Sequence, residues 1–489
     1  MAIKSLIYTL IIIIISMKAL ATDFSELDDY IAKAKSITQS VSGTSVVLIQ
    51  NGKIAHELHH GMADVENQIP VDKNSVYYFA STTKAIMGLA VLQAEQKGLL
   101  KRSSTLNQLF PNSNFRYIDA SKYTVRDLLS HTSGLSHEAM TWTFSYTGNH
   151  DRAQRLDFVS SLKPALKINK GDFDYSNLGY NLMAIWFDEN YKGGWTNAIR
   201  EFVLAPASMM NSTANIDQAR RDGWPIPKPY SYKFQDGQKE IYMNKNNDTL
   251  YSVGIFARPN DWAKLITYLL PINAENTVFP KSVVNDSREI LVDSIDSYFS
   301  GYGWGWMHSK IANEQVLIHT GGFDGSSVQV SYSPEKNIGV VIVHNESGLI
   351  ANELNGSVSE IAYKMLTGHA TEELVGLHLE EMKENAIFIE KAQAKLADER
   401  EKLLKRPNIS AQIQESLEGT YKHAYAGNIV VNVKNKELFM SWGDLQSRVY
   451  PGENPRELVL ELRPGKFFDL KLNKDASVLS LKGWEFYKE

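Results

Sequence analysis

A charged segment from Glu372 to Arg406 separates two regions with different sequence patterns, and this limits how the chain can fold. Apolar residues recur in it every seven positions, at Met382, Ile389, Leu396 and Leu403. Such spacing predicts an amphipathic helix, which Pro407 would stop. Gln393 and Arg400 lie on the same seam, so we expect a helix packed on its own domain rather than a coiled coil. We assign residues 371–410 to this helical connector.

The region before the connector, residues 22–370, alternates strand-like and helix-like patterns. Runs such as "TSVVLIQ" and "GVVIVHN" lie near its two ends, and most apolar helical patterns, such as "TTKAIMGLAVLQAEQ", lie between them. This order predicts an α+β fold. We expect an antiparallel sheet built from both ends of the domain and flanked by helices, with an inserted helical subdomain.

The region after the connector, residues 411–489, contains only short strand patterns. Segments such as "ELFMSW", "RELVLEL" and "FFDLKL" alternate in polarity and are separated by residues typical of turns. This pattern predicts a small all-β domain. A second domain also agrees with the length of 489 residues, because one hydrophobic core seldom extends beyond about 250–300 residues.

The first 21 residues have the pattern of a secretory signal peptide. Lys4 precedes an apolar run from Leu6 to Met17, and the small residues Ala19 and Ala21 occupy the positions that specify cleavage. The run is shorter than the roughly 20 residues that span a bilayer, which disfavours the alternative of an uncleaved anchor. We therefore expect export to the periplasm or the exterior, with no stable membrane span after cleavage.

Charge and cysteine content exclude several classes of function. The net charge is −5, and it becomes −7 when Lys4 and Lys18 are removed with the signal peptide, which disfavours a nucleic-acid partner. The chain has no cysteine, so disulfides, thiolate zinc sites and iron–sulfur clusters are excluded.

Two motifs compete for the role of active site, and the first is the zinc-protease pattern His-Glu-x-x-His at residues 56–60. A zinc site needs both histidines on one helix face. Here β-branched residues and the turn signal Asn51-Gly52 predict a hairpin instead. On a strand, His56 and His60 would lie about 13 Å apart, too far to share one ion. We therefore expect them to be polar residues of a hairpin and predict no metal site.

The second motif is "STTK" at residues 81–84. Ser81 lies where a strand-like run ends and a helix begins, and Lys84, three positions later, shares its helix face. The residues that follow are apolar almost all round, which indicates a buried helix that ends near Gly98. A lysine in such a dry site loses proton affinity and can act as a base. Serine and lysine at this spacing are common by chance, so the motif needs further support.

That support comes from "YSN" at 175–177 and "HTGG" at 319–322, which follow "STTK" in the order found in penicillin-recognising serine hydrolases. Residues 35 to 368 resemble the class C β-lactamases, D-alanyl-D-alanine carboxypeptidases, D-aminopeptidases and esterases of that family. "TVRDLLSHTSGL" and "YGWGW" are also similar to the family's sequences. The resemblance implies a β-lactamase/transpeptidase-like fold, and some relatives carry a barrel-like C-terminal domain.

The resemblance assigns a role to each residue of the site. It implies that Ser81 is the nucleophile and that Lys84 and Tyr175 form one acid/base unit, although the sequence does not decide which of the two takes the serine proton. Asn177 would bind Lys84 and a substrate amide. Residues His319, Thr320 and Gly321 would form an edge strand that binds substrate, because missing side chains at 321 and 322 allow close approach. The backbone N–H groups of Ser81 and Gly322 would form the oxyanion hole.

His319 departs from the lysine that β-lactamases and transpeptidases usually carry. A histidine is a weaker, pH-dependent cation for a substrate carboxylate. We therefore expect a secreted serine hydrolase that cleaves amide, peptide or ester bonds through an acyl-enzyme, of the D-amino-acid peptidase or esterase type. The partner would be a small molecule or peptide, and no cofactor is implied. Two alternatives stay open: a true β-lactamase or D,D-carboxypeptidase, and an inactive binding or sensor protein.

Two further groups of residues are left outside the catalytic set. His131 and Ser133 of "HTSGL" share one turn, and the resemblance gives them structural work. Trp304 and Trp306 are expected in the core, because aromatic residues of a glycine-rich strand are usually buried. The sequence does not indicate the oligomeric state.

Overall fold

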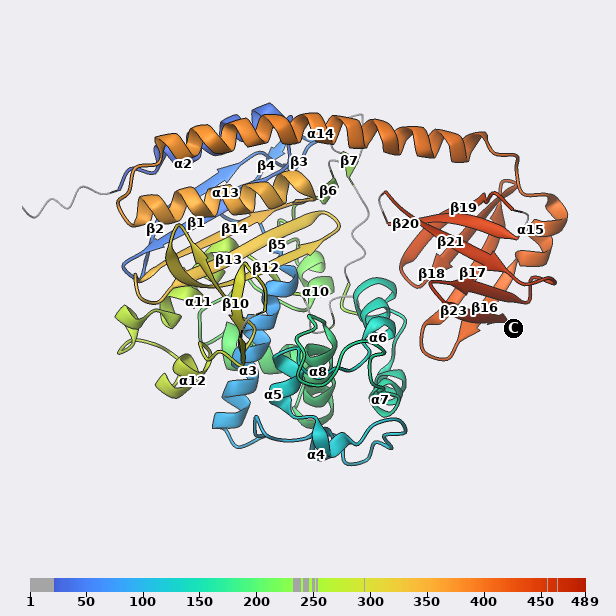
Figure 1. Cartoon of the computed structure of the whole chain (residues 1–489), viewed down its shortest axis with the longest axis horizontal. Helices are drawn as coiled ribbons and strands as arrows, with labels where there is room; N and C mark the ends of the chain where they lie inside the picture. Colours follow the sequence, from blue (N-terminus) through green and yellow to red (C-terminus); the bar gives the residue numbers. More distant parts are fainter. Residues whose placement is uncertain are drawn as a thin grey trace, which may run out of the picture.

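The computed structural model describes residues 22–231, 239–240, 246–248, 251, 254–293, 295–454, 456–463 and 465–489. The predicted signal peptide, residues 1–21, lies outside this part of the chain. Figure 1 shows a larger α+β part on the left and a small β part on the right, joined along the top by one long helix, α14. The described helices include none that is long and apolar enough to cross a membrane.

The centre of the larger part is an eight-stranded sheet in the order β2-β1-β14-β13-β12-β11-β10-β9, antiparallel at every recorded pairing. Its strands are β1 (Thr44–Gln50), β2 (Lys53–His60), β9 (Val292–Asp293), β10 (Phe299–Tyr302), β11 (Met307–Ile311), β12 (Glu314–Phe323), β13 (Ser326–Ser333) and β14 (Ile338–His344). The two ends of the domain thus meet where β1 pairs with β14. This confirms the predicted sheet.

Helices cover both faces of this sheet, as the side chains of β1 show. Val46 and Leu48 pack in one core with α2 (Ser25–Thr38) and α13 (Leu349–Leu366). Val47 and Ile49 point to the opposite core, which contains α3 (Thr83–Gln96) and α11 (Pro259–Leu269). All four side chains are fully buried. Successive side chains of a strand point to opposite faces, so a strand covered on both sides needs a continuous apolar run.

Most helices are inserted between the two ends of the sheet. The remaining helical elements of this region are η1 (Ala80–Thr82), α4 (Leu106–Leu109), η2 (Ala120–Lys122), α5 (Val125–Leu129), α6 (Glu138–Trp142), η3 (Thr143–Thr147), α7 (Arg152–Ser160), α8 (Leu178–Asn190), α9 (Gly194–Ile199), η4 (Arg200–Leu204), α10 (Ile216–Arg221), η5 (Pro271–Asn273) and α12 (Lys281–Asp286). Short strands also occur outside the main sheet: β3 (Met62–Asp64), β4 (Ile69–Pro70), β5 (Tyr77–Tyr78), β6 (Tyr230–Ser231), β7 (Lys239–Glu240), β8 (Phe256–Ala257) and β15 (Glu346–Ser347). The predicted inserted helical subdomain is confirmed.

The C-terminal part is a closed antiparallel barrel of eight strands. They are β16 (Gly419–His423), β17 (Gly427–Lys434), β18 (Glu437–Trp442), β19 (Leu445–Pro451), β20 (Glu457–Arg463), β21 (Lys466–Leu472), β22 (Val478–Leu481) and β23 (Trp484–Lys488). The small all-β domain is therefore confirmed. A short helix that the strand patterns did not predict, α15 (Ala411–Leu417), precedes it.

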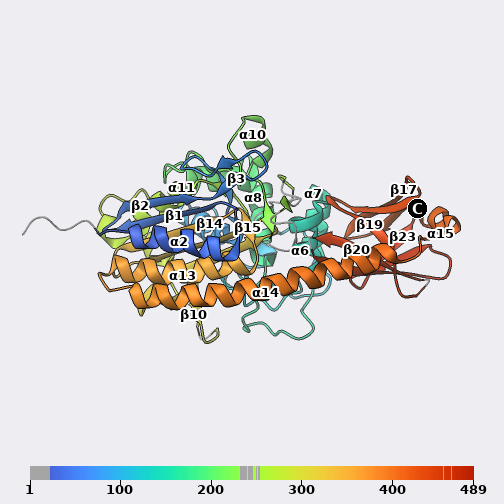
Figure 2. The same ribbon diagram turned by 90° about the horizontal axis from the view of Figure 1, so that it is seen from above.

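Helix α14 (Glu372–Lys405) connects the two parts and packs on both, as Figure 2 shows from above. Met382 and Ile389 belong to the core formed with α2 and α13. Farther along, Arg400 donates through Nε to Glu461 of β20 at 3.1 Å. The predicted apolar seam is the buried face of a helix packed on its own chain.

Candidate active site

Ser81 lies in η1, the tight turn between β5 and α3. The preceding residue, Ala80, has φ of +40°, a backbone conformation that residues other than glycine seldom adopt. Such strain persists only where the surrounding structure holds it, and it is frequent at functional sites. The turn places Ser81 two residues before Thr83, the first residue of α3, near the helix end whose backbone N–H groups are not used by the helix.

Lys84 is fully buried in the first turn of α3, and its amine lies at the centre of the candidate site. Nζ is 3.2 Å from Ser81 Oγ and donates to Asn177 Oδ1 at 2.8 Å. The same nitrogen lies 4.9 Å from the centroid of the Tyr175 ring. The structure therefore brings the four residues predicted from "STTK" and "YSN" together around one amine.

The Tyr175–Asn177 segment precedes α8 and is held in place by His131. The carbonyl of His131 accepts from the Asp174 N–H at 2.8 Å, and its Nδ1 accepts from the Ser176 N–H at 3.2 Å. The His131 ring lies 4.6 Å from that of Tyr175, between ring centroids. His131 is buried, and these two hydrogen bonds support the segment. This is the structural role that the resemblance implied for "HTSGL".

Strand β12 runs past the turn that carries Ser81, but it is an edge only locally. Its pairing with β11 covers Glu314 to Ile318, so 319–323 extend beyond that partner while they pair with β13 on the other side. The expectation of an edge strand is thus correct only for this extension, because the β11–β12 hairpin is short.

The two glycines of β12 have different surroundings. A Cβ at Gly321 would lie 2.9 Å from the Phe79 carbonyl oxygen and 3.0 Å from the Ser81 nitrogen, whereas a Cβ at Gly322 would meet open space. Gly321 therefore allows η1 to lie against β12, and only Gly322 leaves room on the substrate side. The expectation that both absent side chains make space for substrate is corrected for Gly321, since alternate residues of a strand face opposite ways.

His319 is buried and hydrogen-bonded in its neutral form. Its Nδ1 donates to the Thr320 carbonyl oxygen at 2.6 Å, so Nε2 is the acceptor and receives the Tyr302 hydroxyl at 3.4 Å. Burial, and then the nearby Lys84, lower the pKa of His319 from 6.5 to about 3. The expected pH-dependent cation is therefore replaced by a neutral imidazole near neutral pH. Thr320, the next residue, is exposed.

Other residues considered in the sequence analysis are not among the side chains grouped around the Lys84 amine. Trp304 and Trp306 are fully buried core residues, as expected. His56 and His60 lie on β2, where His56 bonds Asp28 at 2.7 Å and the strand places His60 opposite Thr44. Across the described residues, no group of three or more His, Cys, Asp or Glu side chains could hold a metal ion.

The structure adds a support to the site that the sequence did not indicate. Ser145 of η3 accepts from Asn177 Nδ2 at 3.4 Å. The next residue, Tyr146, receives a hydrogen bond from Arg463 Nη1 of the barrel at 3.2 Å. Arg463 also forms a two-point ion pair with Asp324, at 2.7 and 2.9 Å, just after β12. No motif links these residues, because they come from η3, the residue after β12 and the barrel, and meet only in the folded chain.

Comparison with known proteins agrees with this fold. The family model described as Beta-lactamase matches residues 20–360, more than half of the chain. The chain therefore belongs to the beta-lactamase family.

Individual relatives are distant in sequence. Protein flp of Staphylococcus aureus (strain MW2) is 24% identical over 322 residues, which are 62% of this chain and 60% of that protein. Among solved structures, the octameric penicillin-binding protein homologue from Pyrococcus abyssi has a TM-score of 0.63 at 19% identity and covers 95% of this chain and 100% of its own. The D-amino acid amidase from Ochrobactrum anthropi SV3 has a TM-score of 0.56 at 17% identity, covering 72% and 99%. These two likenesses show the fold.

Proposed function

We propose that this protein is an exported serine hydrolase that cleaves amide, peptide or ester bonds through an acyl-enzyme on Ser81. The observation that carries the proposal is the position of the buried Lys84 amine, 3.2 Å from Ser81 Oγ and 2.8 Å from Asn177 Oδ1. A serine hydroxyl needs an adjacent group that takes its proton, and nucleophile and base lie within hydrogen-bond reach in such enzymes.

In the proposed acylation, Ser81 Oγ bonds to the substrate carbonyl carbon while its proton passes to the Lys84–Tyr175 unit. Negative charge on the carbonyl oxygen would be stabilised by the backbone N–H groups of Ser81 and Gly322. The same unit then protonates the leaving amine or alcohol as the carbonyl re-forms. Water adds to the acyl-enzyme in the reverse sense and releases the acid, which restores the Ser81 hydroxyl. No step requires a metal or an organic cofactor.

The surroundings of β12 support a substrate bound without a cationic anchor at position 319. The His319 imidazole is buried and neutral, whereas the exposed Thr320 hydroxyl and the space at Gly322 are on the side open to a ligand. This favours D-amino-acid amides, peptides or esters over substrates whose carboxylate must be held by a lysine. The likeness to a D-amino acid amidase agrees with this choice.

The test is covalent labelling of the full chain with a fluorophosphonate, followed by mapping of the modified residue. We expect the label on Ser81 and none on Ser81→Ala, which should also lose ester hydrolysis. Ser133→Ala, which removes the hydroxyl of "HTSGL", should be labelled like the unmodified protein. Intact, folded protein that takes no label would support the inactive binding protein instead. Comparing penicillin, a D-Ala-D-Ala peptide and a short-chain ester then separates a β-lactamase or carboxypeptidase from the proposed enzyme.

A further inference from the structure

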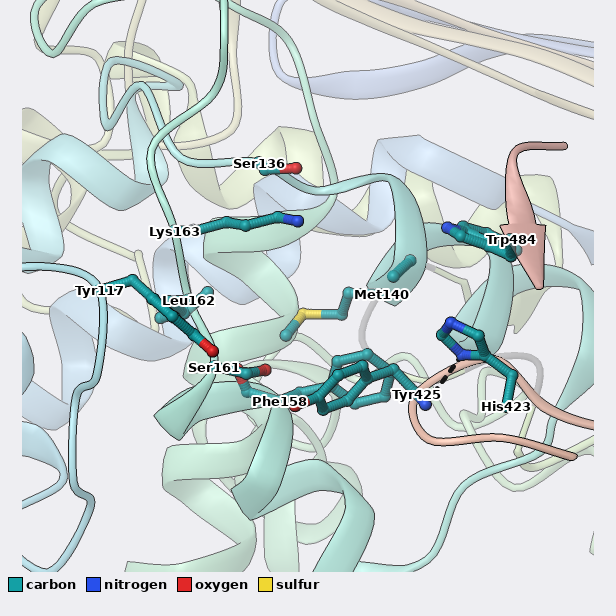
Figure 3. Close-up of a pocket in the computed structure, with 11 residues that line it drawn as sticks. Tyr117, Ser136, Met140, Phe158, Ser161, Leu162, Lys163, His423, Tyr425 and Trp484 are labelled. Carbon is teal, nitrogen blue, oxygen red and sulfur yellow. Dashed lines mark hydrogen bonds between the residues drawn. The ribbon is translucent and has the colours of Figure 1, made fainter. Parts of the chain in front are cut away.

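A cavity of about 460 Å³ lies between the helical subdomain and the barrel, and the proposed chemistry does not use it. One wall comes from α6, α7 and the loops around Ser136 and Leu162, and the other comes from the β16–β17 and β22–β23 turns of the barrel (Figure 3). Among the described residues that line it, none is Ser81, Lys84, Tyr175 or Asn177. It is therefore a separate space from the candidate active site.

The body of the cavity is apolar and aromatic. Met140 and Phe158 enter it from α6 and α7, and Tyr425 and Trp484 enter it from the barrel. The rings of Phe158 and Tyr425 lie 6.0 Å apart, between centroids, so the two walls meet at one end. Pockets for small molecules have this composition and volume, with a few polar groups that orient the ligand.

One end of the cavity carries a free positive charge. Figure 3 shows the Lys163 side chain extending into the space, with its amine near Met140 and Ser136. In the described part of the chain no carboxylate lies within ion-pair distance of this amine, and none lines the cavity. The backbone of Lys163 is fixed, because its carbonyl accepts from the Ser136 N–H at 2.9 Å. Lys163 itself is exposed, so its amine lies at the solvent side of the apolar space, without a counter-charge among the described residues.

The barrel side adds a hydrogen-bond donor whose tautomer the structure fixes. His423 Nδ1 accepts from the N–H groups of Tyr425 and Ala426, at 3.0 and 2.9 Å. In the neutral ring the proton is therefore on Nε2, and burial lowers the pKa of His423, which favours that neutral form. Nε2 lies on the side of the ring away from the Tyr425 nitrogen in Figure 3. The cavity thus has two hydrogen-bond donors, the neutral His423 ring on the barrel side and the Lys163 amine at one end.

We propose that this cavity binds a small amphipathic carboxylate with an unbranched apolar chain, such as a free medium-chain fatty acid. The chain would fill the space between Met140, Phe158 and Trp484, and the carboxylate would pair with the Lys163 amine. Burial of each methylene is favourable, so chain length provides affinity and the amine selects the charge. A cationic amphiphile would meet the same walls but would be repelled by Lys163.

Isothermal titration calorimetry on the full chain tests this with three probes: decanoate below its micelle concentration, decyltrimethylammonium and acetate. We expect saturable binding of one decanoate, at least about tenfold weaker binding of the cation, and no binding of acetate. Lys163→Met should weaken decanoate binding about tenfold, since it removes the cation that pairs with the carboxylate. Lys167→Met, at an exposed lysine of the same loop, should leave the affinity unchanged.

A second variant, Ala139→Phe, places a ring at the cavity wall and should abolish decanoate binding while circular dichroism shows an intact fold. Equal binding of both amphiphiles, or undiminished binding by Lys163→Met, would overturn the proposal. Binding to anionic phospholipid vesicles without binding of free decanoate would also overturn it, in favour of a membrane surface. These measurements do not depend on catalysis, so they separate this site from the proposed function.

Discussion

At the scale of single residues, the Lys84 amine is shared between two oxygen atoms and has no exposed surface. Replacing it with methionine preserves much of the shape but removes the member of the Lys84–Tyr175 unit whose amine lies 3.2 Å from Ser81 Oγ. We expect Lys84→Met to lower kcat/KM for an ester by about 10²–10⁴-fold, the range of a general acid–base contribution. Lys101→Met, at an exposed lysine, serves as the control and should keep full activity. If the fluorophosphonate labelled Lys84→Met as fast as it labels the unmodified protein, the proposed role of Lys84 would be contradicted.

Buried histidines should make the protein less stable in acid. Burial lowers the pKa values of His319 and His344 from 6.5 to about 3 in the folded chain. Between these values the unfolded chain binds protons that the folded chain does not. The contribution of these two histidines to the free energy of unfolding is therefore largest above pH 6.5 and decreases as the pH falls toward 3. Over this range each group raises the unfolding equilibrium constant about tenfold for each pH unit that the pH falls.

His319→Gln tests this dependence, because it removes one of the titrating groups. Urea unfolding at about pH 7.5 and about pH 5 should show a smaller loss of stability for His319→Gln than for the unmodified protein. His369→Gln, at an exposed position, should lose as much stability as the unmodified protein. An identical pH dependence for His319→Gln would show that His319 is not held neutral in the folded state.

At the scale of elements, the site depends on the close contact between β12 and the turn that carries Ser81. Gly321→Ala would place a Cβ 2.9 Å from the Phe79 carbonyl oxygen and 2.7 Å from Val328 Cγ1, so turn and strand must separate. A shift of about 1 Å in a reacting group can cost 10²-fold in rate, and we expect a loss of that order in kcat. Gly356→Ala on α13, where a Cβ meets open space, should retain full activity. Unchanged kcat in Gly321→Ala would show that this contact does not position Ser81.

Local patterns were sufficient to predict the elements that carry the site. The all-round apolar run after Lys84 predicted the buried helix α3, and the runs of β1 and β14 predicted strands of one sheet built from both ends of the domain. The direction of individual side chains could not be predicted in the same way. His319 and Gly321 share one face of β12 and Thr320 and Gly322 the other, and which face meets η1 depends on contacts between segments more than 200 residues apart.

At the scale of the whole molecule, the barrel contacts the larger part through α14, through Arg463, and through α6, whose Trp142 stacks on Trp442 in the barrel core. Helix α14 packs on α2 and α13 and then reaches β20 through the Arg400–Glu461 pair. The second contact is Arg463, which joins Asp324 after β12 to Tyr146 on η3. The apolar seam of the connector predicted that this helix packs on its own domain, whereas its Arg400–Glu461 pair with the barrel was not predicted. The second was not predictable, because it brings together single residues from three distant segments.

Arg463 links the barrel to both sides of the candidate site, so its removal should affect catalysis without unfolding either domain. The side chains of Arg463 and Asp324 are 23% and 13% exposed, and Arg463→Met would leave the Asp324 carboxylate and the Tyr146 hydroxyl without this partner. Both β12 and η3 would then be less well positioned, and we expect kcat/KM to fall about tenfold with most of the loss in kcat. Arg448→Met is the matched control, because Arg448 pairs with Glu437 within the barrel and stacks on Tyr450. It should lower barrel stability in thermal unfolding but keep full activity. If Arg463→Met and Arg448→Met had the same activity, the Arg463 contact would have no part in positioning the catalytic groups.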